Sequence, residues 1–296
     1  MNSRLVIRLG LTCNNYCKFC IFDRKNEHYP DRTNTEIKRI LKNNKNYRSV
    51  VFTGGEPCLR EDLPSLVHFA KALRFNEIQI QSNGRLFTYR DLCKGLIDAG
   101  ATEFAVALHG HNAQIHDGLT NADGSFNQTV KGIVNLKELG QYVITNSVIT
   151  RLNYKHLTSL AQLLINLDIP HFQFSFVHII GQAWANKKDI VIKKSKVIPY
   201  LVKAIKLGSE RNKRVTTEAI PYCLLKEYER CVVEEAIPST TVFELDAKIP
   251  DLRKHRINDK KTKSSKCIKC SYNHSCEGPW KEYPQLFGWQ EFKAIG

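Results

Sequence analysis

The chain has 296 residues, of which 42% are hydrophobic and 25% are charged. This length and composition allow a large buried core, and they exclude a disulfide-stapled miniprotein and a chain with a long disordered region. Lys and Arg outnumber Asp and Glu by 44 − 29 = 15. This basic excess favours acidic partners such as nucleic acid or an acidic peptide, although a general habit of Lys-rich and Asn-rich usage would also produce it.

Short β-branched runs alternate with longer amphipathic segments, which is typical of βα units around a parallel sheet. The sequence predicts strands at 5–7, 49–53, 77–81, 102–108, 142–149 and 171–178. Helical periodicity lies between them, for example at 35–43 and 63–73. Six such units predict an α/β fold that forms a partial (β/α)6 barrel of the TIM type, rather than a complete eight-unit barrel.

Polar and glycine-rich motifs follow the first four predicted strands: "TCNNYC", "TGGEP", "SNGR" and "LHGH". Ligands of parallel βα folds bind at the carboxyl ends of the strands. We therefore expect these four loops to converge on one site. A structural turn after every strand is the weaker alternative.

The βα rhythm stops at about residue 208, which predicts a core domain at 1–208 and a small cysteine-rich domain at 209–296. Within the second domain, "RKHRINDKKTKSSK" at 253–266 predicts an exposed basic linker. The segment "CIKCSYNHSC" at 267–276 follows it and opens a second group of thiols.

The N-terminal apolar stretch is interrupted by Arg4 and Arg8, and no run approaches the length of a membrane span. We therefore expect a cytoplasmic protein without a membrane partner. Its ten cysteines would stay reduced there, so their clustering indicates metal or redox chemistry rather than disulfides. Cys58 and Cys93 stand apart, and we expect them to be small buried hydrophobic residues.

The first thiol group, Cys13, Cys17 and Cys20, follows the first predicted strand with the spacing C-x3-C-x2-C. Three thiolates at this spacing can bind three corners of a 4Fe–4S cube and leave one iron without a protein ligand. A structural zinc ion usually requires four tight ligands, and the nearest fourth candidate is His28, at a different spacing. The vacant corner implies a ligand from outside the chain.

With this motif the chain resembles the radical S-adenosylmethionine superfamily, over roughly residues 4–208. The resemblance implies that Cys13, Cys17 and Cys20 hold a 4Fe–4S cluster, and that the methionine part of S-adenosylmethionine chelates the open iron. It also implies an external one-electron reductant such as flavodoxin or ferredoxin. The implied activity is reductive cleavage of the cofactor to a 5′-deoxyadenosyl radical, which abstracts hydrogen from a substrate.

Two further motifs resemble parts of the cofactor site of that family. In "GGEP", Gly54 and Gly55 would let the backbone approach the methionine amino group, and Glu56 would accept a hydrogen bond from it. In "SNG", Ser82 and Asn83 would contact the ribose.

Three more residues are expected beside the cofactor. Phe19 matches the aromatic residue that lies near the adenine in that family. His109 and Asn146 are assigned to the site only from their places at the ends of later strands, and a structural role is the alternative for each. The sequence identifies no catalytic acid or base.

The C-terminal thiols have the spacing C-x2-C-x5-C, which resembles the auxiliary-cluster region of the SPASM and twitch subfamilies. The resemblance implies one auxiliary 4Fe–4S cluster held by Cys267, Cys270 and Cys276. Cys223 is the preferred fourth ligand, Cys231 is the second choice, and ligation by substrate is the third. A zinc site that uses His274 is the alternative.

Radical enzymes with such an appendage commonly modify ribosomally made peptides. The leading hypothesis is therefore an oxidative or bond-forming peptide maturase, whose basic surface would bind an acidic leader peptide. Radical modification of a small metabolite or of RNA is a second hypothesis. A non-catalytic iron–sulfur or zinc protein that binds nucleic acid is a third, but it leaves "GGEP" and "SNG" without a role, and no known RNA-binding module is apparent.

Overall fold

The computed structural model describes residues 3–23 and 29–296. In this part of the chain one sheet forms the centre of the molecule, with strand order β7-β6-β5-β4-β3-β2-β1-β8-β9. The strands are β1 (Ser3–Arg8), β2 (Ser49–Thr53), β3 (Glu77–Ser82), β4 (Glu103–Ala107), β5 (Tyr142–Ile149), β6 (His171–Phe176), β7 (Arg214–Glu218), β8 (Ser239–Phe243) and β9 (Lys248–Ile249). All six predicted strands are present.

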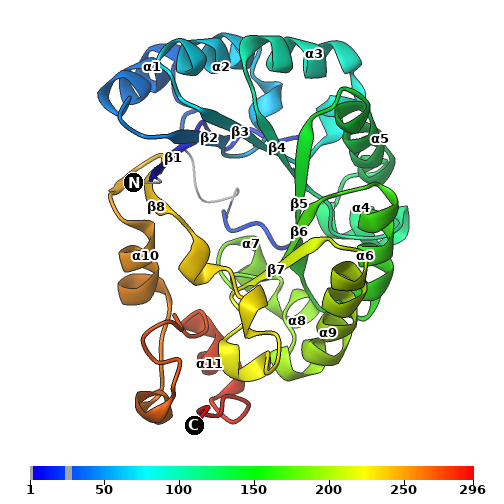
Figure 1. Cartoon of the computed structure of the whole chain (residues 1–296), viewed down its shortest axis with the longest axis vertical. Coiled ribbons are helices and arrows are strands. Elements are labelled where there is room, and N and C mark those ends of the chain that lie inside the picture. The colour runs from blue at the N-terminus through cyan, green and yellow to red at the C-terminus, as the bar shows by residue number, and fades with distance from the viewer. Residues whose placement is uncertain (1–2, 24–28) are drawn as a thin grey trace.

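The sheet curves into an open barrel with helices on its outer face (Figure 1). Every neighbouring pair from β7 to β8 is parallel, and only β8 and β9 pair antiparallel. The helices are α1 (Asn34–Asn43), α2 (Leu63–Ala72), α3 (Arg90–Ala99), α4 (Ala113–Thr120), α5 (Ser125–Glu138), α6 (Leu157–Asn166), α7 (Gln182–Ala185), α8 (Lys187–Ile190), α9 (Lys194–Glu210), α10 (Leu252–His255) and α11 (Glu282–Phe287). The predicted partial α/β barrel is therefore confirmed.

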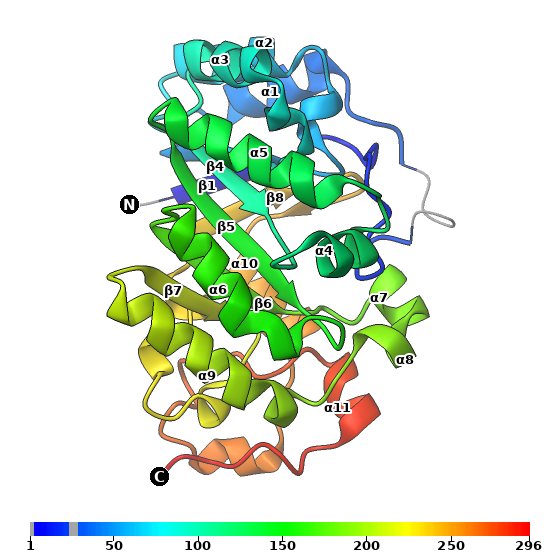
Figure 2. The same cartoon turned by 90° about the vertical axis from the view of Figure 1, so that its right-hand side faces the viewer.

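The predicted helices at 35–43 and 63–73 correspond to α1 and α2. A capping box starts α1, since Thr33 Oγ1 accepts from the Glu36 backbone N–H at 3.2 Å while Glu36 accepts from the Thr33 N–H at 2.7 Å. The apolar side chains of Ile37 and Leu41 lie one turn apart and are fully buried against the sheet. In Figure 2, α5, α6 and α9 cover the outer face of the strands in the same manner.

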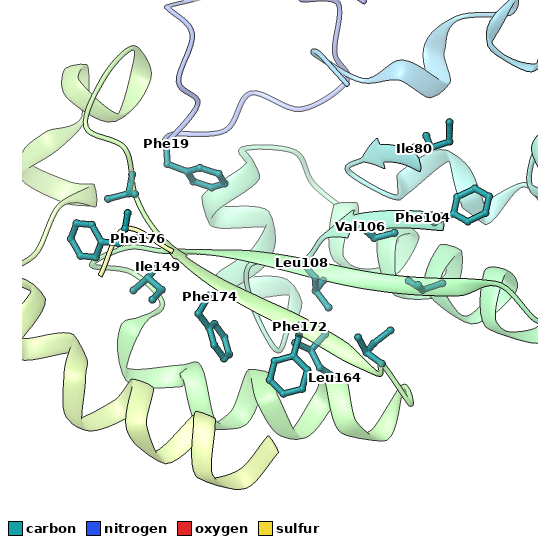
Figure 3. Close-up of a cluster of buried hydrophobic side chains, with 14 of the residues drawn as sticks. Phe19, Ile80, Phe104, Val106, Leu108, Ile149, Leu164, Phe172, Phe174 and Phe176 are labelled. Carbon is teal, nitrogen blue, oxygen red and sulfur yellow. The ribbon is translucent and has the colours of Figure 1, made fainter. Parts of the chain in front are cut away.

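The hydrophobic core fills the space between the strands and this helical layer. Its largest members include Phe104 on β4 and Phe172 and Phe174 on β6, all fully buried (Figure 3). Cys58 and Cys93 also belong to this core, which confirms their expected role as small buried residues. Burial of such side chains contributes roughly 1.5–3 kcal/mol for each one.

The sheet continues beyond the point where the βα rhythm was expected to stop. β7 adds to β6, and β8 returns to the opposite edge and pairs with β1, with Ser239 beside Ser3. Both strands are only 5 residues long, and no helix of ordinary length separates them, so periodicity alone did not identify them. The domain boundary at 208 stays a prediction.

The segment 253–266 is only in part the exposed linker that its charge suggested. It contains α10 and a short π-helical turn at Arg256–Lys260, and the side chains of Arg256 and Lys261 are buried. They are buried because acidic partners surround them inside the fold, as described below. In the described part of the chain, no helix combines the length and the apolar character that a bilayer crossing requires.

Candidate functional site

A large cavity opens at the carboxyl ends of the first five strands. About 1050 Å³ of space there, counted out to where the cavity opens to solvent, is not filled by protein atoms, which leaves room for a cofactor and part of a substrate. The residues expected at the site that line it are Cys13, Cys17, Phe19, Cys20, Gly54, Gly55, Ser82, Asn83, His109 and Asn146. The four converging loops predicted from the sequence therefore do meet at one place. His28 lies outside the described residues.

The loop that carries the three cysteines is held from several sides. The backbone N–H groups of Tyr16 and Lys18 donate to the carbonyls of Thr120 and Leu119 at the end of α4, at 2.9 and 3.0 Å. On the other side, the N–H of Gln182 at the start of α7 donates to the Cys20 carbonyl at 2.9 Å. These bonds come from the scaffold, so they fix the thiols relative to the strands before any ligand is bound.

The two glycines of "GGEP" allow their loop to pack directly against the cysteine loop. The N–H of Gly55 donates to the Gly10 carbonyl at 2.9 Å. A Cβ atom on Gly55 would lie 2.2 Å from the Thr12 carbonyl oxygen, and Gly54 has a φ of +146°, so a side chain at either position would force the loops apart. The lack of a side chain at Gly54 and Gly55 therefore allows the two loops to pack together, and the same two residues form part of the cavity wall.

Glu56 is the one expected cofactor contact that does not line the large cavity. Its carboxylate is 2% exposed and accepts from the Ser82 hydroxyl at 2.8 Å, the Asn83 N–H at 2.7 Å and the Cys58 N–H at 3.0 Å. Burial nevertheless raises the pKa of Glu56. Glu56 thus joins the second loop to the third, and its expected contact with the cofactor stays a prediction.

Asn83 and Arg85 connect the third loop to the cysteine loop. The Asn83 amide donates to Asn14 Oδ1 at 2.7 Å, and the Arg85 guanidinium donates to the Asn15 side chain at 2.9 Å and also to the Asn14 carbonyl. Sequence reasoning assigned no role to Arg85. The sequence did contain a clue to this role, because Arg85 is the last residue of the "SNGR" motif that follows the third strand.

His109 is a buried neutral imidazole at the cavity wall. Its Nδ1 accepts from the Val148 N–H at 3.1 Å, so the proton resides on Nε2, and burial lowers the pKa of His109 well below its ordinary value. The Phe19 ring meets it edge-on with ring centroids 4.6 Å apart. Together they offer an apolar face and one N–H donor.

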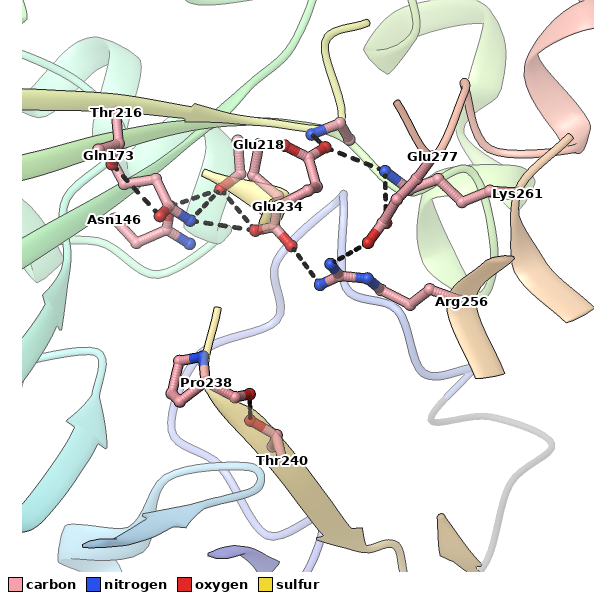
Figure 4. A network of polar contacts seen from close by, with 12 residues as sticks. Asn146, Gln173, Thr216, Glu218, Glu234, Pro238, Thr240, Arg256, Lys261 and Glu277 are labelled. Carbon is pink, nitrogen blue, oxygen red and sulfur yellow. Dashed lines mark hydrogen bonds and ion pairs between the residues drawn. The ribbon is translucent and has the colours of Figure 1, made fainter. Parts of the chain in front are cut away.

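Asn146 leads from the cavity into a polar network (Figure 4). Its Oδ1 accepts from the Ser175 hydroxyl at 2.8 Å, and that hydroxyl also lies 3.2 Å from Glu218 Oε2. The Gln173 amide donates to the same Glu218 oxygen at 3.0 Å. The ends of β5, β6 and β7 are thus connected by side chains, and Glu218 is a member that the sequence did not point to.

Beyond Glu218, buried ion pairs connect the barrel to the C-terminal region. Arg256 lies 3.4 Å from Glu218 and 2.6 Å from Glu277, and Lys261 lies 3.1 Å from Glu234. Four of these five side chains are at most 6% exposed. Buried charges require such pairing because each is costly to remove from water. These pairs therefore fix the position of the C-terminal segment relative to the barrel.

The C-terminal thiols surround a second, smaller cavity of about 460 Å³. It is lined by Cys223, Cys267, Cys270 and Cys276. Burial raises the pKa of the Cys223 thiol to about 11, and the other three sulfurs add to this rise. Cys231 is buried in the core and does not line this cavity.

His274 likewise does not line the second cavity. Among the described residues, no three His, Cys, Asp or Glu side chains are close enough together to hold a single metal ion. A 4Fe–4S cluster differs from a single ion, because each of its thiolates binds a different iron.

Comparison with known proteins gives both a family and a fold. A family model described as "Radical SAM superfamily" matches residues 7–164, somewhat more than half of the chain. An "AdoMet-dependent heme synthase" of Oleidesulfovibrio alaskensis is 30% identical over 175 residues, which is 58% of this chain and 45% of that protein. A "Probable GTP 3′,8-cyclase" of Saccharolobus islandicus is 29% identical over 59% of this chain and 58% of its own length.

The chain therefore spans about half the length of the curated relatives that it matches. Among solved structures, Streptococcus suis SuiB bound to S-adenosylmethionine has a TM-score of 0.70 at 18% identity, over 99% of this chain and 76% of that one. At this identity the likeness concerns the fold, and it extends through the C-terminal cysteine region.

Proposed function

Because the chain belongs to the radical SAM superfamily, we propose that it cleaves S-adenosylmethionine reductively and abstracts hydrogen from a substrate. The observation that carries this proposal is the large cavity, where three thiols, two glycines, Ser82 and Asn83 meet at the carboxyl ends of the strands. The family uses a 4Fe–4S cluster and S-adenosylmethionine, and the residues present fit both groups.

In this proposal Cys13, Cys17 and Cys20 hold the cluster, and the cavity beside them receives the cofactor. Three thiolates leave one iron open, and the space next to the thiols is large enough for the ligand of that iron. When bound, the cluster supplies one electron that breaks the sulfonium bond of the cofactor and yields a 5′-deoxyadenosyl radical.

The chain's own residues orient the cofactor and shield the reaction. Phe19 supplies an apolar surface for a purine, and His109 supplies a neutral N–H donor beside it. Asn146 contributes an amide at the same wall. Gly54 and Gly55 keep the neighbouring loop close, and Glu56 fixes Ser82 and Asn83 through hydrogen bonds.

Cys223, Cys267, Cys270 and Cys276 hold an auxiliary 4Fe–4S cluster in this proposal. The support is that these four thiols, and not Cys231, line one small cavity. Four thiolates complete the ligand set of a cluster and leave no iron open for a second ligand. A site of that kind suits electron transfer better than substrate binding.

The substrate in our proposal is a peptide, which undergoes an oxidative or bond-forming modification. The support is the fold shared with SuiB over nearly the whole chain, including the cysteine-rich end, since SuiB was also crystallised with its precursor peptide SuiA. A small metabolite is the second candidate, because the sequence relatives are named as a heme synthase and a GTP cyclase.

Anaerobic reconstitution with iron and sulfide, followed by metal analysis and an assay for 5′-deoxyadenosine, tests the proposed chemistry. We expect about eight irons per chain and reductant-dependent 5′-deoxyadenosine. Absence of 5′-deoxyadenosine with every reductant would contradict the proposed activity. Four irons with one zinc would keep the activity and contradict the auxiliary cluster. Deuterium transfer from candidate peptides or porphyrins into 5′-deoxyadenosine then distinguishes the two substrate classes.

A further inference from the structure

A patch of positive charge surrounds the C-terminal thiol cavity. We call it the C-terminal basic surface and define it by Lys263, Lys266, Lys269, Lys293 and Ile268. All four lysines are exposed, and Ile268 is 74% exposed, the largest exposed fraction among the large hydrophobic residues described. A single exposed apolar side chain is common on protein surfaces, so the four lysines are the feature that distinguishes this surface.

The charged residues of this surface are all positive. The stretch 260–276 contains five lysines, at 260, 261, 263, 266 and 269, and no Asp or Glu. Lys261 is buried and paired with Glu234 and Glu277, so it does not contribute to the surface. The exposed lysines have no acidic neighbour within this stretch to neutralise them, and they create a local positive potential that attracts an acidic partner.

The basic surface lies directly against the thiols. Lys263, Lys266 and Lys293 line the same cavity as the four cysteines, and Ile268 lies between Cys267 and Cys270 in the sequence. A partner that contacts this surface therefore comes close to whatever the cysteines hold. The surface lies at the end of the molecule opposite α1, α2 and α3 (Figures 1 and 2).

We propose that the C-terminal basic surface is the docking site for an acidic one-electron carrier protein, which exchanges electrons with the auxiliary cluster. This inference rests on the proposed function, because it requires a redox centre at the four cysteines. Weak electron-transfer complexes use small contacts steered by charge, and a group of four exposed lysines beside the thiols has that character.

The electron balance of the exchange is simple. Oxidation of a substrate radical releases one electron and one proton, and the electron must leave the protein before the next turnover. An oxidised flavin or iron–sulfur carrier accepts this electron and becomes reduced by one electron. No covalent bond to the protein forms or breaks in this step.

An acidic leader peptide is the competing occupant. It would also be attracted to lysines, but it would gain nothing from lying beside the thiols, whereas an electron carrier must come close to the redox centre. A peptide that binds in extended form would also be expected to use a longer apolar groove with several side-chain pockets. The closeness of lysines to cysteines is therefore the feature that favours the carrier.

Calorimetric titration of the reconstituted protein with oxidised flavodoxin tests the inference. We expect Kd to rise about tenfold between 50 and 300 mM salt. The double variant Lys266→Glu/Lys269→Glu should weaken binding by at least a further tenfold at low salt. The matched control is Lys42→Glu/Lys45→Glu, which makes the same charge change at exposed lysines next to α1 and should bind like the wild type.

A kinetic measurement adds a second criterion. The Cys17→Ala protein keeps only the C-terminal centre, and after chemical reduction its oxidation by flavodoxin is followed from the flavin absorbance. The Lys266→Glu/Lys269→Glu change should slow this rate at least tenfold and leave oxidation by a small neutral quinone unchanged.

Equal binding and equal rates in the two double variants would overturn the inference. So would a polyglutamate peptide that binds as tightly as flavodoxin and displaces it, because the surface would then recognise any polyanion. Zinc instead of iron at the C-terminal cysteines would overturn it as well. In each of these cases normal 5′-deoxyadenosine formation would show that the proposed cleavage of S-adenosylmethionine still stands.

Discussion

The two cysteine regions differ in the number of thiols and in the volume of the cavity beside them. The N-terminal region places three thiols at the wall of a cavity of about 1050 Å³, and the C-terminal region places four around about 460 Å³. Three ligands with ample space suit a cluster that must accept another molecule, whereas four ligands in a small cavity suit one that must not. Cysteine spacing and surrounding space together support the proposal that the N-terminal centre performs the chemistry.

The two regions are also held in place by different forces. Backbone groups of the barrel hold most of the N-terminal loop, as in the bonds from Tyr16 and Lys18 to the end of α4, and Arg85 is the charged side chain that adds to them. The C-terminal region is attached to the barrel by buried ions, above all Arg256 between Glu218 and Glu277. Backbone hydrogen bonds persist when a side chain is substituted, whereas a buried ion loses stabilisation when any one of its charged partners is removed.

The strongest test of this comparison is a pair of cysteine substitutions. Cys17→Ala should abolish 5′-deoxyadenosine formation and remove about four irons per chain, while the C-terminal iron remains. Cys270→Ala should destabilise the other cluster and leave reductive cleavage of the cofactor largely intact. Iron analysis and a single-turnover cleavage assay measure both. If Cys270→Ala abolished cleavage and Cys17→Ala did not, the assignment of the two centres would be reversed.

The second largest effect should come from the buried ions. Arg256→Leu removes the ion pair of Glu218 and leaves Glu277 with Lys261 as its remaining cationic partner. Removal of one partner from a buried ion pair costs about 3–5 kcal/mol. We expect a corresponding fall in the free energy of unfolding, measured by denaturant titration. Arg253→Leu, one turn earlier on α10 and outside this network, is the matched control and should cost less than about 1 kcal/mol. Equal losses would mean that the network adds no stability.

The sequence predicted the first region much better than the second. Cys13, Cys17 and Cys20 are close in sequence and follow a strand, so spacing and the βα rule together placed them at the cavity. The same rule placed His109 and Asn146 at its wall. Glu56 was placed in the right loop, but its side chain faces Ser82 and Asn83 because three donors there satisfy its carboxylate.

The C-terminal region was harder to predict because its contacts are long-range. Arg256 and Lys261 occur in a stretch that looks solvent-exposed by composition, and only the fold brings Glu218 and Glu234 to them. β8 pairs with β1 across more than 230 residues of chain. No local pattern encodes such a pairing, so sequence periodicity could not reveal it.

Acid should weaken the barrel through its buried histidines. Burial lowers the pKa of His116 to about 4, whereas an unfolded histidine has a pKa of about 6.5. The unfolded state therefore binds more protons between these values, and stability falls as the pH drops below about 6.5. His116→Gln should reduce the stability difference between pH 7 and pH 5 by about 2 kcal/mol, measured by denaturant titration. An unchanged difference would mean that His116 has nearly the same pKa in the folded protein as in the unfolded chain.

The smallest expected effect concerns the two upstream cysteines of the C-terminal region. Cys231 is 6% exposed and belongs to the core, so Cys231→Ala should lower the unfolding free energy by about 1 kcal/mol and leave the iron content unchanged. Cys223 lines the cavity with the other three thiols, so Cys223→Ala should lose or destabilise the auxiliary cluster. Iron analysis and the cluster absorbance distinguish the two variants. If both kept their iron, the auxiliary cluster would have only three protein ligands, and the contrast between an open and a closed centre would disappear.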